Sequence, residues 1–303
     1  MVDLYWTKTS SSTTYARYSI TLKNSSGTLY DPNTTWQQKL GESSDRMLSI
    51  KFTCDQGLVL PANCRYLFAY ANSDWSTKSN IKNFTSVDTS EVENMTYMFY
   101  YSDLRFVDFS NFNTSNVTNM SHMFEHAHHI LNVDNGYDVP TDLTSFDISK
   151  VTTMNSMFYH SNLEGPLWIE GWDVSNVDDF QVMFGPSAFG TSAEGYRHTN
   201  IEHNGIYVGE NIDWSRQIKH TANTTNMFSH TSAYNGKYLK RAEEPYDIRW
   251  ANTGSRGVFW GDKAEFWDKY NLYFYDSEFT SYSVLEKTNG TWEDVDVYKK
   301  TSS

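Results

Sequence analysis

One eight-residue phrase recurs through the middle of this 303-residue chain. Residues 117–124 read V-T-N-M-S-H-M-F, and residues 92–99, 151–158 and 177–184 keep its Val, its second Met and its Phe. Internal repetition of this kind is typical of a stack of similar units. A single unit cannot bury its apolar face alone, so each must pack on its neighbours. The repeat therefore constrains the fold more than any other feature of the sequence.

The apolar residues of the phrase fall at i, i+3, i+6 and i+7, as Val117, Met120, Met123 and Phe124 illustrate. This spacing predicts one buried face of a short helix or of successive turns. A serine stands two residues before each Val, where an N-cap residue would accept a backbone N–H of the first turn. These serines are Ser90, Ser115, Ser149 and Ser175.

An aspartate also recurs at one repeat position, as Asp88, Asp147, Asp173 and Asp213. A row of carboxylates at strand spacing is compatible with calcium binding or with acid–base chemistry on glycosides. Asn113 replaces aspartate in the series, however, and both residue types bond their own following backbone in turns. We therefore favour turn formation, and the sequence predicts no catalytic residue.

Both ends of the chain show β patterns without the repeat. Residues 18–22 alternate apolar and polar side chains, and residues 24–27 (N-S-S-G) predict a turn into a hairpin with residues 29–30. Residues 48–52 alternate again and predict a further strand. The Asn-Gly pair inside residues 283–298 predicts a second hairpin near the C-terminus.

These patterns predict a solenoid, a short leucine-rich-repeat-like stack of parallel strands with β-rich N-terminal and C-terminal caps. Short extended segments between the phrases, near residues 104–110 and 167–169, would supply one strand per repeat. The predicted parts are an N-terminal β-rich domain or cap at residues 1–53, the solenoid with insertions at 54–236, and an aromatic-rich C-terminal β cap at 237–303.

The repeat resembles that of the BspA-like leucine-rich repeat proteins of bacteria, which reads approximately F-D-T-S-N-V-T-N-M-S-x-M-F. Residues 111–124 (N-F-N-T-S-N-V-T-N-M-S-H-M-F) match it almost letter for letter, and residues 146–151 and 172–177 match well. The clear resemblance covers residues 84–184, about a third of the chain. It implies a curved parallel-strand solenoid and a role in binding or adhesion at surfaces, with no catalytic residues to carry over.

Composition argues against two classes of partner. The formal net charge is −13 and the 24 Lys and Arg residues do not cluster, whereas nucleic-acid binding needs clustered cations to neutralise phosphates. No apolar run approaches the ~20 residues of a membrane helix, so we expect no membrane insertion. The N-terminus has no basic segment followed by an apolar one, so the chain is expected to work without export or to lack its signal.

Two groups of residues raise the question of thiol or metal chemistry. Cys54 and Cys64 either close a small disulfide loop or remain free thiols, and without an export signal we favour free thiols. Imidazoles and a carboxylate gather just after one phrase, where they offer either a metal site or a solvated loop. These residues are His122, Glu125, His126, His128 and His129. We favour a solvated loop for them, and we predict that the protein binds no metal and no cofactor.

Aromatic residues outside the buried repeat positions are the best candidates for recognition, because exposed rings stack on sugars or anchor a protein partner. The alternative is packing beneath the insertions. The group comprises Tyr97 and the five residues predicted to bind a ligand, which are Tyr100, Tyr101, Phe106, Tyr159 and Trp168.

The sequence thus favours a non-enzymatic binding or structural protein. Working without an export signal fits a bacteriophage virion surface component, such as a tail fibre, receptor-binding or capsid-decorating protein. Its expected partners are other virion proteins, further copies of itself, and host surface glycan or protein. A bacterial cell-surface adhesin fragment and a carbohydrate-active enzyme are the alternatives, and the adhesin would be extracellular or on the cell surface.

Overall fold

The structure, a computed structural model, describes most of the chain, with gaps. The described ranges are 2–24, 30–71, 81–103, 107–129, 141–163, 167–186, 188–189, 205–210, 212–234, 239–241, 248–253, 259–260, 283–288 and 291–296. The chain divides into two compact units, Met1–Gly261 and Asp262–Ser303. Within the described ranges, no helix has the length and apolar character needed to cross a membrane.

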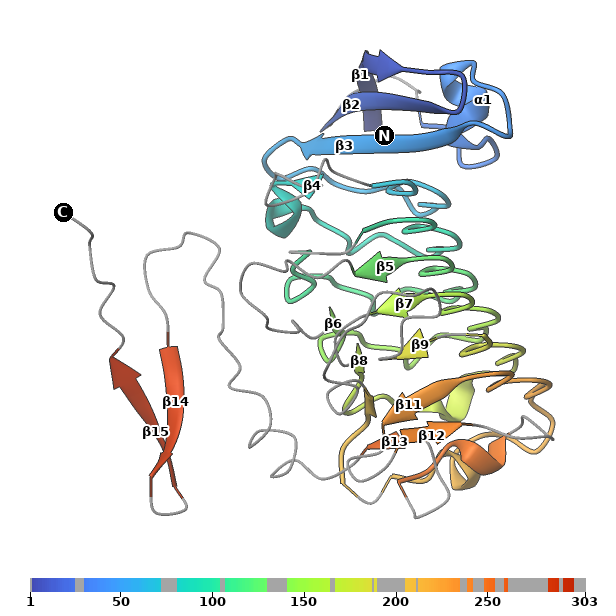
Figure 1. Cartoon of the computed structure of the whole chain (residues 1–303), viewed down its shortest axis with the longest axis vertical. Helices are drawn as coiled ribbons and strands as arrows, with labels where there is room; N and C mark the ends of the chain where they lie inside the picture. The colour runs from blue at the N-terminus through green and yellow to red at the C-terminus, as the bar shows by residue number, and fades with distance from the viewer. Residues whose placement is uncertain are drawn as a thin grey trace. The chain divides into compact units, whose positions relative to one another are not determined.

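The first compact unit begins with a four-stranded sheet in the order β1-β2-β3-β4 (Figure 1). The antiparallel pair β1 (Val2–Ser11) and β2 (Tyr15–Asn24) is followed by β3 (Met47–Cys54) and β4 (Ile81–Lys82), each parallel to the strand before it. Alternate side chains of β2 and β3 are buried, as their two-residue period requires.

The strands predicted at residues 18–22 and 48–52 are therefore confirmed, but the hairpin predicted with residues 29–30 is wrong. The two neighbours of β2 are β1 and β3, which leaves no edge for that pairing. The real hairpin turns at Ser12, whose N–H donates to the Tyr15 carbonyl (2.8 Å) and whose hydroxyl accepts from the Tyr15 N–H (3.2 Å). Its turn has no Gly or Asn, so the usual sequence pattern is missing.

A short helix, α1 (Trp36–Leu40), packs on this sheet. Thr35 and Gln38 form a capping box at its start, and Gly41, with φ of 66°, ends it in the left-handed conformation that glycine adopts without strain. Trp36 is fully buried, with its ring 5.7 Å from that of Phe52 on β3. The helix thereby closes one side of the sheet over a large aromatic core.

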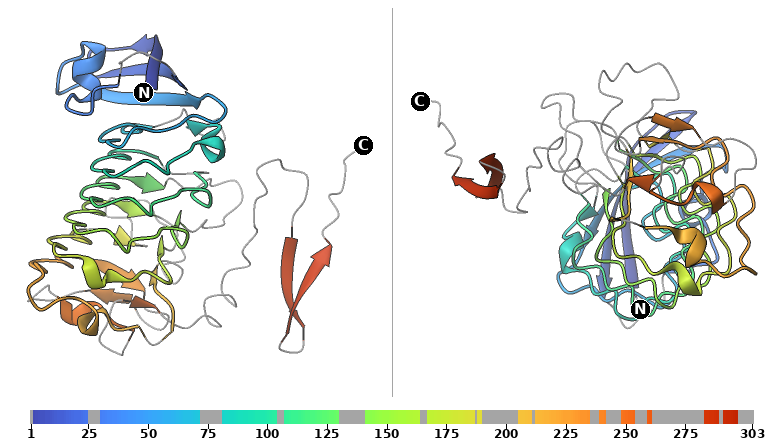
Figure 2. Two further views of the ribbon diagram at one scale, coloured as in Figure 1. Left: turned by 180° about the vertical axis from the view of Figure 1, so that it is seen from behind. Right: turned by 90° about the horizontal axis from the view of Figure 1, so that it is seen from below.

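Successive repeats then lie one under another, as Figures 1 and 2 show for this compact unit. Each is hydrogen-bonded in parallel to the next, through paired positions that recur once per repeat: Asn63, Asn94, Asn119, Thr153, Asp179 and Asn223. The phrase itself forms successive turns rather than a helix. The repeats are therefore joined by parallel pairing. The predicted fold class, a short leucine-rich-repeat-like solenoid with β-rich caps, and the predicted domain boundaries stay predictions.

A column of phenylalanines forms the centre of the stack. The last residue of each phrase is fully buried and stacks on its counterpart in the next repeat, with ring centroids 5.2–5.7 Å apart. The column consists of Phe68, Phe99, Phe124, Phe158, Phe184 and Phe228. The Val and Met positions of each phrase are also buried, so the apolar positions of the repeat form the core of the stack.

The recurring aspartates make turns. Asp88, Asp147, Asp173 and Asp213 each accept the N–H of the residue two positions on, at 2.9–3.0 Å, and Asn113 does the same. Asp173 and Asp213 are also the N-caps of one-turn 3₁₀ helices, so the prediction of serine caps is wrong. The aspartate two residues earlier accepts the serine N–H in an Asx turn and so occupies the cap position itself.

Short strands run alongside the turns. One parallel sheet has the order β13-β10-β8-β6, formed by Phe259–Trp260, Ile206–Tyr207, Leu167–Trp168 and Thr141–Asp142 respectively. A second parallel pair joins β5 (His128–His129) to β7 (Asn162–Leu163). In a three-stranded sheet, β11 (Ser232–Tyr234) is parallel to β9 (Ala188–Phe189) on one side and antiparallel to β12 (Leu239–Arg241) on the other. One-turn 3₁₀ helices occupy Phe84–Ser86, Val174–Asn176, Trp214–Arg216 and Ile248–Trp250.

The second compact unit contains one antiparallel pair, β14 (Ser283–Thr288) and β15 (Thr291–Asp296). Thr288 pairs with Thr291, which confirms the strands of the hairpin predicted from the Asn-Gly pair between them. Those two residues themselves lie outside the described ranges.

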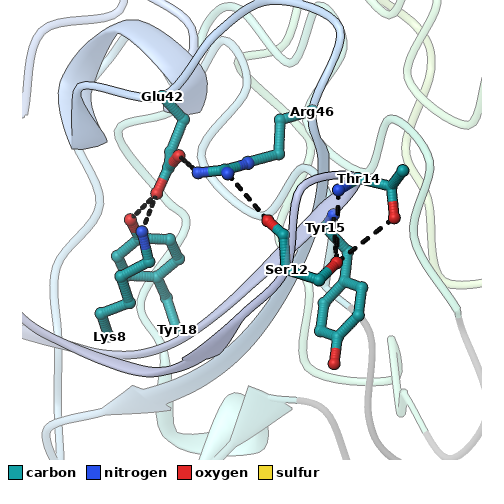
Figure 3. A network of polar contacts seen from close by, with 7 residues as sticks. All are labelled: Lys8, Ser12, Thr14, Tyr15, Tyr18, Glu42 and Arg46. Atoms are coloured by element: carbon teal, nitrogen blue, oxygen red, sulfur yellow. Dashed lines mark hydrogen bonds and ion pairs between the residues drawn. The ribbon is translucent and has the colours of Figure 1, made fainter.

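Near α1, a buried carboxylate holds the N-terminal sheet to the segment that follows the helix. Figure 3 shows Lys8, Tyr18 and Arg46 converging on Glu42, with Lys8 Nζ 2.6 Å from Oε1. Arg46 also donates to the Ser12 carbonyl (2.7 Å), which ties the network to the β1–β2 turn. Hydrogen bonds from Lys8, Tyr18 and Arg46 lower the pKa of Glu42 from its usual 4.5 to about 2.

This network predicts a pH-dependent contribution to stability. A carboxylate with a depressed folded-state pKa stabilises fully above its unfolded pKa, and the contribution is lost as the pH falls toward the folded value. Glu42→Gln should therefore lower the free energy of unfolding at pH 7, and the deficit should shrink between about pH 4.5 and pH 2. Urea unfolding at pH 7, 4 and 2.5 measures this; a deficit that is constant with pH would contradict it.

Candidate functional site

The left-handed backbone conformation recurs at two positions of the repeat, two and six residues after the first Met of the phrase; in the repeat that ends at Phe184 only the first of them has it, since the second is Pro186. In the repeat that begins at Met95 these are Tyr97 (φ 56°) and Tyr101 (φ 53°), and in the next they are His122 (φ 58°) and His126 (φ 54°). Residues other than glycine adopt this conformation rarely. It recurs here in every repeat, also at Ser156, Val182 and Asn226, so it belongs to the winding of the chain.

The first of these positions forms a stack of rings that we call the first ladder: Tyr66, Tyr97 and His122. The ring of Tyr97 lies 4.7 Å from that of Tyr66 and 4.3 Å from that of His122, at interplanar angles of 13° and 10°. Both faces of Tyr97 are therefore covered, and burial raises its pKa to about 12.

The second position forms the longer second ladder: Tyr70, Tyr101, His126 and His160. Consecutive ring centroids are 6.0, 4.3 and 5.0 Å apart, and no pair is tilted by more than 16°. Tyr101 and His126 thus each have a ring on either face. The ladder spans four repeats at a spacing close to the ~4.7–4.9 Å between neighbouring strands.

Tyr100 lies between the ladders, with its ring almost perpendicular to Tyr97 (87°) and Tyr101 (78°). Since the faces of both neighbours are occupied, their edges meet the faces of Tyr100. Burial raises the pKa of Tyr100 well above its usual range. Tyr159 has the equivalent position two repeats on, and makes similar perpendicular contacts with His126 and His160. We call the two ladders with Tyr100 and Tyr159 the Tyr/His face.

Few charged groups accompany this face. The Arg65 guanidinium lies 5.0 Å from the ring centroid of Tyr66 and 5.6 Å from that of Tyr97. Glu125 occupies the repeat position of Tyr100 and Tyr159, and its carboxylate is hydrogen-bonded to His122 Nδ1. At the N-terminal end, Gln37 of α1 donates to the Tyr70 hydroxyl (3.0 Å). The face is therefore mainly neutral, with phenol and imidazole as its hydrogen-bonding groups.

The predicted ligand-binding residues are divided by the structure. Tyr100, Tyr101 and Tyr159 come together on the Tyr/His face and are partly exposed. Trp168 is only 9 % exposed, because β8 is an inner strand and the ring packs on Tyr207 of β10. The expectation that Trp168 is an exposed aromatic is therefore wrong. Phe106 lies outside the described residues.

The histidine cluster is also divided. His122 and His126 belong to different ladders, and rings of Tyr97 and Tyr101 stack on them. They do not lie in a solvated loop, as the sequence had suggested, because the left-handed positions bring them back over the preceding repeat. Among the described side chains, no three His, Cys, Asp or Glu converge on a metal-sized site. His128 and His129 form β5, and their side chains are outside that description.

Both cysteines, in contrast, follow the prediction of free thiols. Cys54 and Cys64 are buried and unbridged. Burial raises the pKa of the Cys54 thiol to about 12, and that of Cys64 still further above its usual range. Neither thiol is therefore a reactive thiolate at neutral pH.

Sequence reasoning missed most of the Tyr/His face: Tyr66, Tyr70, His122, His126 and His160. A pattern that identifies them was present, because they fall at the second and sixth positions after the residue aligned with the first Met. Reading the repeats as aligned columns shows Tyr and His exchanging at both positions. Each residue read alone looks like an ordinary polar aromatic.

These features define a repeat protein with a buried phenylalanine column and, along its flank, two ladders of tyrosine and histidine rings. The chain belongs to the family described as "Mycoplasma protein of unknown function, DUF285", which matches it at residues 62–193 and 137–242. The matched residues include every repeat that contributes to the Tyr/His face and exceed half of the chain. No curated protein and no solved structure matched the chain.

Proposed function

We propose that this chain is a non-enzymatic binding module of the BspA-like leucine-rich-repeat type, and that its Tyr/His face binds host surface glycan or protein. The continuity of that face carries the proposal. Partly exposed phenol and imidazole groups follow one another at a regular spacing over four repeats. A protein that needed tyrosine and histidine only for packing would bury them, whereas phenylalanine already fills the core of each repeat.

The recurring aspartates favour this reading over a glycoside-cleaving enzyme. Asp88 and Asp147 accept backbone N–H groups of their own turns, and these bonds lower the pKa of each carboxyl. A general acid on a glycoside needs a raised pKa near the working pH. Asp88 and Asp147 are therefore suited to forming turns and unsuited to donating protons.

The binding proposal predicts a loss specific to the face. Fluorescently labelled protein is incubated with a panel of bacterial and animal cells, and binding is followed by flow cytometry. On cells that bind the native protein, the double variant Tyr101→Ala/His126→Ala should weaken binding by about 30-fold or more, as loss of interface hot spots of ≥2 kcal/mol requires. Tyr5→Ala is the matched control, because Tyr5 is an exposed aromatic on β1, outside the face.

Equal losses in both variants, or none in the double variant, would overturn the assignment of binding to this face. Circular dichroism of each variant checks that the fold is retained. The particle or cell that displays the module is a separate part of the proposal. We place the module on the surface of a bacteriophage particle, with the bacterial cell surface as the alternative. Mass spectrometry of purified particles and of cell envelopes decides between them.

A further inference from the structure

The way in which the rings are packed limits what the Tyr/His face can recognise. Tyr97, Tyr101 and His126 each have a stacked ring on both faces, at a centroid distance of 4.3 Å on the closer side and 4.7–6.0 Å on the other. The His126 side chain is nonetheless 28 % exposed. What these rings offer to a partner is therefore their edges, which carry the phenol hydroxyls and the imidazole nitrogens. A sugar cannot stack on a ring face that is already occupied.

The chemistry of the edges is that of a bifunctional hydrogen-bonding surface. A phenol hydroxyl both donates and accepts, and a neutral imidazole has one donor and one acceptor nitrogen. The carboxylate of Glu125 is hydrogen-bonded to His122, and after burial its charge is a further cause of the raised pKa values of Tyr97 and Tyr100. A ligand that is rich in hydroxyl groups matches such a surface, because each hydroxyl also donates and accepts.

The spacing of the edges adds a second constraint. In the second ladder, four rings follow one another along the direction in which the repeats stack, and the centroids of consecutive rings are 4.3–6.0 Å apart. An extended peptide advances by ~3.2–3.4 Å per residue and alternates its side chains, so it falls out of register with this period. A linear glycan built of one kind of sugar carries the same hydroxyl groups on every ring, so its donors and acceptors recur along the chain.

The rings are also fixed before any ligand arrives. Stacking on both sides and the left-handed backbone hold each edge in place, which lowers the entropic cost of binding. Protein interfaces, in contrast, concentrate their energy in a few rings that insert into pockets on the partner. Rings that are locked side by side are poorly suited to insertion.

We propose that the Tyr/His face binds a linear, hydroxyl-rich glycan laid along the direction in which the repeats stack, and that ring edges rather than ring faces recognise successive sugars. This inference rests on the proposed function, because it uses the same face. It adds the ligand class, the direction of the chain and the contacting atoms. The key residues are Tyr97, Tyr101, His126 and His160.

The test uses the full chain and an array of defined linear oligosaccharides of one to six sugars, with affinities of the hits measured by calorimetry. Affinity should rise with length up to about four sugars, one for each ring of the second ladder, and then level off. Tyr101→Phe keeps the stacked ring and removes only its hydroxyl, so edge recognition predicts about a 3- to 10-fold loss. Tyr5→Phe is the matched control and should bind as the native protein does.

Unchanged affinity in Tyr101→Phe, or affinity that is independent of length, would overturn recognition by ring edges. If no oligosaccharide binds while Tyr101→Ala/His126→Ala still abolishes cell binding, the glycan inference falls and the proposed function stands. Protease treatment of the cells would then remove the binding partner, as a protein ligand requires. If the double variant binds cells normally, the proposed function itself fails.

Discussion

Replacing Phe124 by alanine is expected to lower the free energy of unfolding by about 3–5 kcal/mol, the range for a fully buried phenylalanine. Phe124 has no exposed surface and stands in the middle of the phenylalanine column. Its ring centroid is 5.6 Å from that of Phe99 and 5.4 Å from that of Phe158. A third ring, Phe109, meets it nearly at right angles at 5.9 Å.

The position of Phe124 makes its loss more serious than an isolated cavity. In a stack, each repeat is stabilised by its own packing and by its interfaces with two neighbours. The cavity weakens both interfaces of the central repeat, so the N-terminal and C-terminal halves of the stack should lose cooperativity. Urea unfolding followed by far-ultraviolet circular dichroism should show an earlier and broader transition.

A surface variant provides the comparison for Phe124→Ala. Glu91 is exposed in the same part of the stack, and Glu91→Ala should change stability by less than about 0.5 kcal/mol. If Phe124→Ala were no more destabilising than Glu91→Ala, the stacked phenylalanine column would not be the core of the protein.

The central repeats were predictable because the apolar positions of their sequence pattern are the positions that the fold buries. Val117, Met120, Met123 and Phe124 are all fully buried, as the spacing of the phrase indicated. The spacing alone left helix and turns as alternatives, and the structure has turns. Hydrogen bonds from each repeat to the next, such as Phe124 N–H to the Met157 carbonyl (2.9 Å), take the place of the bonds within a helix.

The N-terminal sheet was only partly predictable. The buried alternation of β2 and β3 is visible in the sequence, but the parallel pairing between them depends on α1 and the chain around it. Strand β1 was missed because several of its large side chains are exposed: Tyr5 is 56 % and Trp6 51 % accessible. An edge strand of this kind has no clean apolar alternation to detect.

The candidate site was the least predictable part, since it depends on the conformation of single residues. Sequence reasoning found Tyr100, Tyr101 and Tyr159 as outward aromatics, and it misjudged Trp168. It placed His122 and His126 in a loop, because the histidine side chain does not predict the left-handed backbone conformation that both residues adopt. The ladders arise only when that backbone recurs in successive repeats and brings the same columns into contact.

Replacing Trp36 by alanine should affect both stability and the Tyr/His face. Trp36 is fully buried in α1, and its indole N–H donates to the Tyr66 carbonyl at 2.8 Å. Loss of the ring costs about 3–5 kcal/mol in packing, and loss of the indole hydrogen bond adds about 0.5–1.5 kcal/mol, because the Tyr66 carbonyl still accepts the Ala69 N–H (3.1 Å). Tyr66 begins the first ladder, and the next residue of α1, Gln37, donates to Tyr70, which begins the second.

A second substitution separates packing from positioning. Trp36→Phe retains most of the buried ring but removes the N–H, so it should cost only about 0.5–1.5 kcal/mol. Gln56→Ala on the exposed surface should cost less than about 0.5 kcal/mol. Urea unfolding measures the stabilities. Near-ultraviolet circular dichroism should also change in Trp36→Phe at the tyrosine bands, because the first ring of the ladder is no longer held through its backbone. If Trp36→Phe matched the native protein in both measurements, α1 would not position the ladders, and the repeats alone would hold the Tyr/His face in place.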